Sequence, residues 1–215
     1  MLDPYTNPVV DPITGFAIPA SWIQLCPDPQ ALQKIQSGRW VILSNGLLCR
    51  RGLTTGTTAS GACKGAILSL KGSVHNLEVA TPAGITVSLP VMAKDGFCLA
   101  VKDGGDHQFD VTAGLEIAAQ ARPSEETSLI AGNGVGRIVA RGLCDDVGRP
   151  AISPSAREQI MLAIWQALQE TGLTGAAVEL SIPRGLELAN ETLNPRLGIL
   201  GGISILGSTG FVEPW

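Results

Sequence analysis

Hydrophobic and polar positions alternate most regularly between residues 77 and 105. A period of two is typical of β-strands that bury one face. Turn signals at Pro82-Ala83-Gly84 and Lys94-Asp95-Gly96 divide the segment, which therefore predicts an antiparallel meander. The side chains expected to face the core are Leu77, Val79, Ile85, Val87, Leu89, Val91, Phe97, Leu99 and Val101.

Two other segments change to the helical period of three to four residues. Residues 53–72 carry an apolar stripe at this spacing, and Thr57 or Thr58 is expected to cap the start of the helix. Ser153-Pro154 opens the clearest helix in the chain, which Gly172 is expected to close.

The N-terminal part of the chain has weaker patterns. Residues 1–27 are rich in Pro and Asn and predict an extended arm. Asp28-Pro29 predicts the start of a short helix. Residues 40–51 place two apolar runs around Asn45-Gly46, which favours a hairpin with a type I′ turn.

The remaining apolar runs predict strands at 115–122, 128–132 and 177–183 and a short helix at 185–193. Strands grouped on one side of a few helices favour an α+β fold. We expect a two-layer sandwich with a mostly antiparallel or mixed sheet and a few helices. Residues 1–49 then form an N-terminal arm with a short helix and a hairpin strand, and residues 50–215 form the α+β domain.

Composition and charge narrow the possible partners. The chain has 215 residues, 45% of them hydrophobic, which is enough for one sizeable core. Fifteen basic and nineteen acidic residues form no basic stripe, so we expect no nucleic-acid partner. No apolar run reaches the roughly 20 residues of a membrane span. The N-terminus lacks the features of a signal peptide, so we expect a cytoplasmic protein without a membrane partner.

The five cysteines are widely spaced and form no C-x-x-C pair, and the chain has two histidines. This pattern argues against a disulfide framework and against a closed zinc site. We therefore expect no protein-bound metal.

A run of hydroxyl side chains, Thr54-Thr55-Gly56-Thr57-Thr58, precedes the first long helix. Hydroxyls and free backbone N–H groups at a helix start can bind an anion, so all five residues are candidate ligand contacts. Ordinary N-capping is the alternative, although it requires one threonine. The residue types leave both interpretations open.

Acidic and glycine residues crowd the segment from Lys102 to Asp110. Asp103 and Asp110 are candidate catalytic residues, as proton acceptor or as orienting carboxylates, with Gly104 and Gly105 in the same cleft. An acidic turn between strands is the alternative.

Two glycine-rich segments are further candidates. Gly134 and Gly136 belong to a G-x-G-x-G run, but the residues after it predict a strand where a nucleotide-binding loop requires a helix. Residues 194–210 contain five glycines and the single charge of Arg196. Such a segment can approach a flat ligand closely or pack tightly against another element, and both remain open. Its candidate contacts are Asn194, Arg196, Gly201, Gly202, Ser204, Gly207 and Thr209.

Taken together and in order, these segments resemble the cobalt-precorrin-5B C1-methyltransferase family, the CbiD family. The residues that carry the resemblance are RRGLTTGTTASGACKGA (50–66), VKDGGD (101–106), DVTAGLEI (110–117), GNGVGRIVARGL (132–143), VGRPAISPSAREQI (147–160) and IPRGLELANETLNPRLGILGGISILGSTGFVEP (182–214).

The resemblance implies a function. The family uses S-adenosylmethionine to methylate C1 of a ring-contracted cobalt corrinoid, a flat polycarboxylate that brings the cobalt with it as part of the substrate. Methyl transfer is an in-line displacement, for which the protein mainly has to position two ligands. Arg184 and Arg196 suit the acidic side chains of such a substrate, and the glycine-rich segment suits its flat face.

Family members usually continue beyond the V-E-P element into a second domain. The resemblance therefore implies that the family's C-terminal domain is absent here, and that a second copy or a separate C-terminal half is a possible partner. Ile203, Leu206, Phe211 and Trp215 are then expected to be exposed or covered by that partner. The alternative functions are a non-catalytic tetrapyrrole-binding or partner module and a nucleotide-binding domain. The missing G-x-x-x-x-G-K-[ST] motif excludes a P-loop for the latter.

Overall fold

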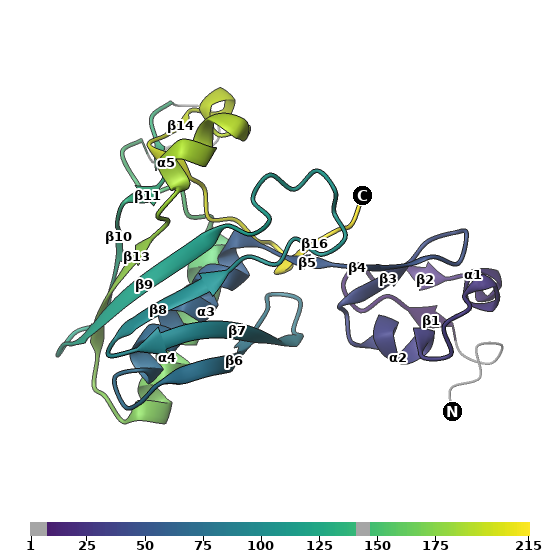
Figure 1. The fold of residues 1–215 in the computed structure, drawn as a ribbon, viewed down its shortest axis with the longest axis horizontal. Coiled ribbons are helices and arrows are strands. Elements are labelled where there is room, and N and C mark those ends of the chain that lie inside the picture. The colour runs from purple at the N-terminus through teal and green to yellow at the C-terminus, as the bar shows by residue number, and fades with distance from the viewer. Residues whose placement is uncertain (1–7, 141–146) are drawn as a thin grey trace.

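The computed structural model describes residues 8–140 and 147–215. Its body is a six-stranded sheet in the order β10–β13–β9–β8–β7–β6 (Figure 1). The strands are β6 (Val74–Ala80), β7 (Thr86–Lys94), β8 (Phe97–Val101), β9 (Glu116–Pro123), β10 (Ser128–Ala131) and β13 (Ala176–Ser181). Neighbouring strands run antiparallel except β10 and β13, which pair in parallel, so the sheet is mixed.

The predicted meander is confirmed, but the prediction of which residues of its third strand face the core, which we call the phase of the strand, is wrong. Cys98 is buried, whereas Phe97 and Val101 lie on the outer face with 45% and 44% of their surface exposed. The cause is the two-residue loop Asp95-Gly96, which has the positive φ angles of a type I′ turn, 51° and 82°. This loop pairs Cys98 with the buried Ala93, and directly paired residues share a face.

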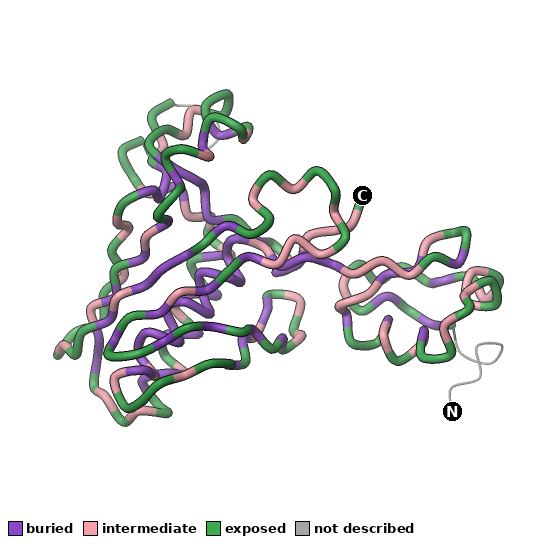
Figure 2. The backbone as a smooth tube through the Cα atoms, viewed as in Figure 1, coloured by how far each residue is buried: buried purple, intermediate pink, exposed green. Residues whose placement is uncertain are grey.

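Two long helices, α3 (Thr55–Leu68) and α4 (Pro154–Thr171), lie on one face of the sheet (Figure 1). The first packs directly on five strands and the second packs mainly on α3, so buried positions run along α3 and the strands beneath it (Figure 2). Small residues let α3 approach closely, because a Cβ atom at Gly65 would lie 2.5 Å from Cys98 Sγ. The two-layer α+β prediction is therefore confirmed.

Local signals set the helix ends, with one correction. The Ser153 hydroxyl accepts a backbone N–H of the first turn of α4 at 3.3 Å, and Gly172 ends this helix with a left-handed φ of 69°, both as predicted. The N-cap of α3 is Thr54, whose Oγ1 accepts the backbone N–H of Thr57 at 3.2 Å. The predicted caps Thr57 and Thr58 already lie inside the first turn.

Residues 8–50 fold into a small unit beside the body (Figure 1). Its elements are β1 (Val9–Val10), β2 (Ala17–Ile18), α1 (Ala20–Leu25), α2 (Ala31–Gln36), β3 (Trp40–Ile42) and β4 (Leu48–Arg50). Its own small core consists of Val9, Ile18, Ile35 and Ile42. The extended arm predicted for residues 1–27 is therefore wrong over residues 8–27.

The hairpin predicted at residues 40–51 is confirmed, but its turn differs. The backbone N–H of Gly46 donates to the carbonyl oxygen of Leu43 at 2.9 Å, so the turn begins at Leu43. Asn45 lacks the positive φ that a type I′ turn requires at both central residues. The five-residue loop leaves only Gly46 in the left-handed region, at φ 81°.

The C-terminal part of the chain adds short elements that return to the body. These are α5 (Gly185–Leu188), β11 (Gly134–Val135) paired with β15 (Gly202–Ile203), β12 (Arg137–Ile138) paired with β14 (Ile199–Leu200), and β5 (Gly52–Leu53) paired with β16 (Phe211–Val212). Ile203 and Phe211 are buried in these pairings, which contradicts their predicted exposure, whereas Leu206 and Trp215 are 50% and 65% exposed.

A buried arginine joins the small unit, the body and the C-terminal strand. Arg51 is fully buried and its guanidinium donates to Asp11 at 2.8 Å and to Glu213 at 2.9 Å. It also donates to the carbonyl oxygens of Gly38 and Trp40. Three segments that are distant in sequence therefore meet at one side chain.

Candidate functional site

Six of the predicted site residues, namely Thr54, Thr55, Asp110, Asn194, Arg196 and Ser204, line one cavity of about 620 Å³, which we call the main pocket. It lies where the start of α3, the loop after β8 and residues 190–212 meet. Its lining includes Thr54, Thr55, Lys102, Phe109, Asp110, Val111, Thr112, Leu193, Asn194, Arg196, Ile203, Ser204, Leu206 and Val212. Side chains from three of the four candidate segments thus share one concave surface.

The threonine run contributes two of its four hydroxyls to this pocket. Thr55 Oγ1 donates to the carbonyl oxygen of Ser204 at 3.2 Å and accepts the N–H of Leu206 at 2.9 Å. Thr54 lines the pocket beside it while capping α3. Capping, one of the two alternatives, therefore applies to Thr54, while anion binding by Thr54 and Thr55 stays a prediction.

The rest of the threonine run points elsewhere. Thr57 and Thr58 are fully buried, and their hydroxyls donate to the carbonyl oxygens of Gly210 at 2.9 Å and Thr54 at 3.0 Å. A Cβ atom at Gly56 would lie 2.9 Å from the carbonyl oxygen of Leu206, so Gly56 is a close packing contact. Binding roles are thus better supported for Thr54 and Thr55 than for the other three residues.

Asp110 lies in the main pocket as a partner of Lys102. Its carboxylate accepts the Lys102 ammonium and, through the second oxygen, the Thr112 hydroxyl at 2.6 Å. Burial raises the pKa of Asp110, but the hydrogen bonds from Lys102 and Thr112 outweigh it and hold this pKa below 3.8. Asp110 is therefore a carboxylate at neutral pH and a weak base, which suits the orienting role better than proton acceptance.

Asp103 lies outside the main pocket. It accepts hydrogen bonds from Arg50 and, at 2.6 Å, from Arg39. Burial raises the pKa of Asp103, but the hydrogen bonds from Arg50, the Gly105 backbone and Arg39 have the larger combined effect and hold this pKa below the ordinary value of 3.8. The geometry gives this carboxylate the role of joining the small unit to the loop after β8.

Gly104 and Gly105 support that loop through close packing. A Cβ atom at Gly104 would lie 2.6 Å from Ala113, and one at Gly105 would lie 2.3 Å from the backbone nitrogen of Gly52. Gly105 also has a positive φ of 62°, which disfavours any side chain there.

The segment 194–210 contributes three polar side chains to the main pocket. Asn194 Oδ1 accepts the Ser204 hydroxyl at 2.9 Å, and its Nδ2 donates to the carbonyl oxygen of Gly202 at 3.3 Å. Both residues are buried, so they form a fixed part of the wall. Arg196 is exposed and lines the same pocket.

Three further candidates, Arg184, Gly207 and Thr209, lie away from the main pocket. Arg184 is exposed and pairs with Glu187 at 2.8 Å. Gly207 packs against Thr54 in a neighbouring small cavity, and Thr209 Oγ1 accepts the N–H of Phe211 at 3.2 Å. These residues have local structural partners.

Backbone packing accounts for most of the glycine pattern. A Cβ atom at Gly134 would lie 1.9 Å from the carbonyl oxygen of Ile182, and one at Gly202 would lie 2.1 Å from that of Gly134. Gly136 similarly faces the carbonyl oxygen of Gly202 at 2.9 Å. Gly201 has open space around it. Tight packing, one of the two alternatives left open for residues 194–210, therefore applies to Gly202, and Gly134 and Gly136 pack closely in the same way.

Sequence reasoning did not select Lys102, although this side chain is only 2% exposed and lines the main pocket. A signal was present, since Lys102 continues the every-second-residue series Cys98, Ala100 that faces the helices. The incorrect phase predicted for β8 hid it. Phe109, which is 83% exposed at the mouth, was missed because loop aromatics carry no periodic signal.

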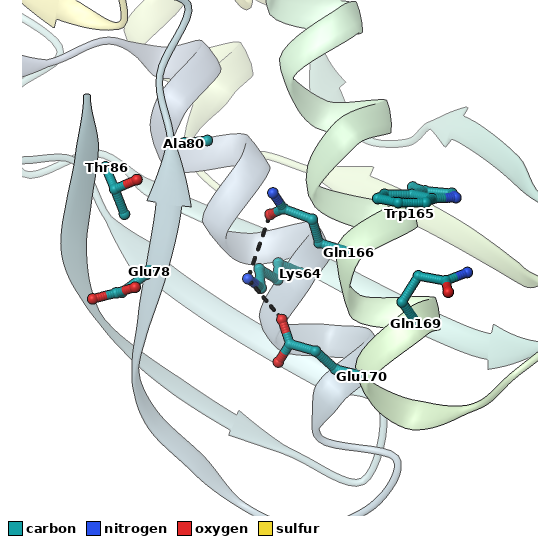
Figure 3. Close-up of a pocket in the computed structure, with 8 residues that line it drawn as sticks. All are labelled: Lys64, Glu78, Ala80, Thr86, Trp165, Gln166, Gln169 and Glu170. Carbon is teal, nitrogen blue, oxygen red and sulfur yellow. Dashed lines mark hydrogen bonds and ion pairs between the residues drawn. The ribbon is translucent and has the colours of Figure 1, made fainter. Parts of the chain in front are cut away.

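A second cavity of about 480 Å³ lies between the two long helices and strands β6 and β7 (Figure 3). Lys64 of α3 dominates it, with an ion pair to Glu170 at 3.0 Å and a hydrogen bond to Gln166 at 3.5 Å. These contacts join α3 to α4 and involve no residue predicted to bind a ligand. A third cavity of about 560 Å³ lies beside Arg51, with Trp22 and Trp215 in its lining.

No group of three or more His, Cys, Asp or Glu side chains in residues 8–140 and 147–215 is placed to hold a metal ion. Within the same ranges, no helix combines the length and apolar character needed to cross a bilayer.

Comparison with known proteins gives consistent matches. The family model of CbiD matches residues 43–214. The cobalt-precorrin-5B C(1)-methyltransferase of Methanococcoides burtonii is 46% identical over 209 residues, which are 96% of this chain and 62% of the relative. The protein of the same name from Archaeoglobus fulgidus is 44% identical over 207 residues, which are 96% of this chain and 64% of the relative.

A solved structure agrees with the fold. The crystal structure of the cobalamin biosynthesis protein cbiD from Archaeoglobus fulgidus superposes with a TM-score of 0.83 at 42% identity. The match covers 96% of this chain and 68% of that chain. The chain spans 62% of the length of the curated relatives from Methanococcoides burtonii, Methanoregula boonei and Methanosarcina acetivorans.

Proposed function

The chain belongs to the CbiD family, and from this membership we propose that it transfers a methyl group from S-adenosylmethionine to C1 of cobalt-precorrin-5B. One observation within the chain carries the proposal. Residues from three segments that resemble the family, among them Thr55, Asp110 and Arg196, line a single pocket.

The lining of the main pocket suits both ligands. Its volume of about 620 Å³ is within the range of small-molecule sites. The carboxylate of Asp110 suits the cationic groups of S-adenosylmethionine, and the hydroxyls of Thr54 and Thr55 suit hydrogen-bonding ligand groups. Around this polar interior, Phe109, Leu193 and Leu206 are exposed, which suits contact with the flat face of a macrocycle.

The chain's own residues then act by binding and orientation. Bound S-adenosylmethionine supplies an electrophilic methyl group. Arg196 holds a carboxylate arm of the corrinoid, and the Asn194–Ser204 hydrogen bond fixes the wall against which it lies. Asp110 keeps a negative charge inside the pocket at neutral pH. Holding two ligands at reactive distance is the main contribution required for a displacement of this kind.

The direct test is methyl transfer by the 215-residue chain. The protein is incubated with S-adenosylmethionine labelled in its methyl group and with cobalt-precorrin-5B. We expect the label at C1 of the corrinoid, detected by mass spectrometry and carbon NMR. The Arg196→Gln variant should raise the KM for the corrinoid about tenfold and change kcat by less than about threefold, because it weakens binding in the ground state.

Arg122→Gln is the matched control, since Arg122 is exposed at the end of β9, outside the main pocket. Transfer to another carbon, or no transfer, would contradict the proposed reaction. Binding of the corrinoid without transfer would favour a tetrapyrrole-binding module instead.

A further inference from the structure

The interior of the main pocket contains a buried ammonium group with few partners. The Lys102 side chain is 2% exposed, and its carboxylate partner Asp110 is 10% exposed. A lysine ammonium carries three N–H donors. In the part of the chain that the structure describes, Asp110 is the one side chain that accepts from Lys102 Nζ.

The Lys102 ammonium therefore has more N–H donors than the protein provides acceptors. A buried donor that meets no acceptor loses its hydration without compensation, and the loss is larger for a charged group. Asp110 is also shared, because its other oxygen accepts both the backbone N–H of Thr112 at 3.0 Å and the Thr112 hydroxyl at 2.6 Å. The ammonium of Lys102 thus faces the pocket with hydrogen-bonding capacity that the protein leaves unused.

We propose that Lys102 is the receptor for a ligand carboxylate at the inner end of the main pocket. This inference rests on the proposed function, which supplies two carboxylates: an acidic arm of the corrinoid and the methionine carboxylate of the methyl donor. A carboxylate oxygen provides the acceptor that the ammonium lacks, in a charge-assisted hydrogen bond. Thr55 lines the same pocket.

The assignment also gives the loop after β8 a function. Asp110 follows Phe109, which is exposed at the mouth of the main pocket. The loop that carries the aromatic ring is held by hydrogen bonds within itself, from the Thr112 N–H and hydroxyl to Asp110 and from the Ala113 N–H to the carbonyl oxygen of Asp110, and none of these involves Lys102. When the carboxylate comes from the corrinoid, Lys102 and Phe109 contact the same ligand. Lys102 binds its acidic arm, and Phe109 contacts its ring.

The test compares a corrin acid with its ester. Dicyanocobyrinic acid presents free carboxylates, and its fully methylated ester presents the same ring without them. We expect Lys102→Met to weaken binding of the acid about 10- to 100-fold in a spectroscopic titration and to leave the ester within about twofold. A parallel titration with S-adenosylhomocysteine shows whether the methyl donor is the source of the carboxylate instead.

Lys94→Met is the matched control, because it removes the same charge from an exposed side chain on β7. The proposal is supported if Lys102→Met binds either acid ligand more weakly than the wild type does and Lys94→Met does not. Unchanged affinity for both acid ligands, or an equal loss for the acid and the ester, overturns it.

Asp110→Asn provides a second test if Lys102→Met does not fold. It leaves the ammonium without its carboxylate partner, so the acid should bind at least as tightly as to the wild type. Weaker binding by the folded variant would overturn the proposal. These titrations measure binding alone, so a failure of methyl transfer by the wild type would contradict the proposed function independently of Lys102.

Discussion

At the scale of single residues, burial and partners separate side chains that look alike in the sequence. Thr54 and Thr55 line the main pocket, whereas Thr57 is fully buried. Asp103 and Asp110 are seven positions apart, yet the first is held by two arginines outside the pocket and the second by a lysine inside it. The residue types marked the candidate segments, and the tertiary contacts determine which of the similar residues line the main pocket.

The lowered pKa of Asp110 predicts a pH dependence of stability. The folded pKa lies below the ordinary value of 3.8, so the ion pair stabilises the fold above about pH 4 and this contribution is lost as the pH falls through the folded pKa. Asp110→Asn should cost about 2 kcal/mol of unfolding free energy at pH 7 and flatten the decline below pH 4. Urea denaturation at several pH values between 3 and 7 measures both effects.

Asp95→Asn is the appropriate comparison, because Asp95 is a highly exposed aspartate in a turn. It should leave the acid decline close to that of the wild type. An Asp110→Asn variant with an unaltered acid decline would show that the Lys102–Asp110 pair contributes little to stability.

At the scale of elements, periodic segments could be predicted and short ones could not. Helices α3 and α4 and the meander have enough residues for their period to be recognised in the sequence. The two-residue strands β11 and β15 have no period, and they exist because glycine backbones touch. The phase of β8 depended on the Asp95-Gly96 loop, whose geometry overrides the pattern of larger side chains.

The β11–β15 contact leads to a prediction with an internal control. Gly134 and Gly201 have similar left-handed φ angles, 74° and 77°. A Cβ atom at Gly134 would meet a backbone oxygen at 1.9 Å, whereas one at Gly201 would meet nothing within 4 Å. Gly201→Ala should cost about 1 to 2 kcal/mol, the usual left-handed penalty.

Gly134→Ala should cost at least about 3 kcal/mol, because the backbone must also move apart. Thermal and urea unfolding of the two variants measure the difference. Equal losses would mean that φ alone explains both glycines and that the backbone contact is not close in solution.

At the scale of the whole molecule, three separate segments depend on Arg51. Its partners Asp11 and Glu213 come from the small unit and from the residue after β16. Sequence patterns could not predict this contact, since a single arginine between two strands has no periodic signal. The pocket was partly predictable because hydroxyl, acidic and glycine residues marked its segments, but their convergence depends on long-range pairing.

Arg51→Met should destabilise the protein by about 3 to 5 kcal/mol, because Asp11 is 2% exposed and would remain as an unpaired buried charge. Urea denaturation followed by tryptophan fluorescence measures the loss, and Trp22 and Trp40 report on the small unit. Limited proteolysis should show earlier cleavage within residues 8–50.

Arg157→Met serves as the comparison, because Arg157 is exposed on α4. It should stay within about 0.5 kcal/mol of the wild type. A similarly small change for Arg51→Met would show that the hydrophobic contacts of the small unit hold it in place without the arginine.

The hydrogen bond between Thr55 and Ser204 has a consequence for how the protein is made. These residues are 149 positions apart, so a ribosome adding about 5 to 20 residues per second needs roughly 7 to 30 seconds to synthesise the chain between them. During this time Thr54 and Thr55 have left the exit tunnel without the wall that completes the pocket. The main pocket is therefore assembled late in synthesis, because a nascent chain stalled before Ser204 would lack the wall that residues 203–212 contribute.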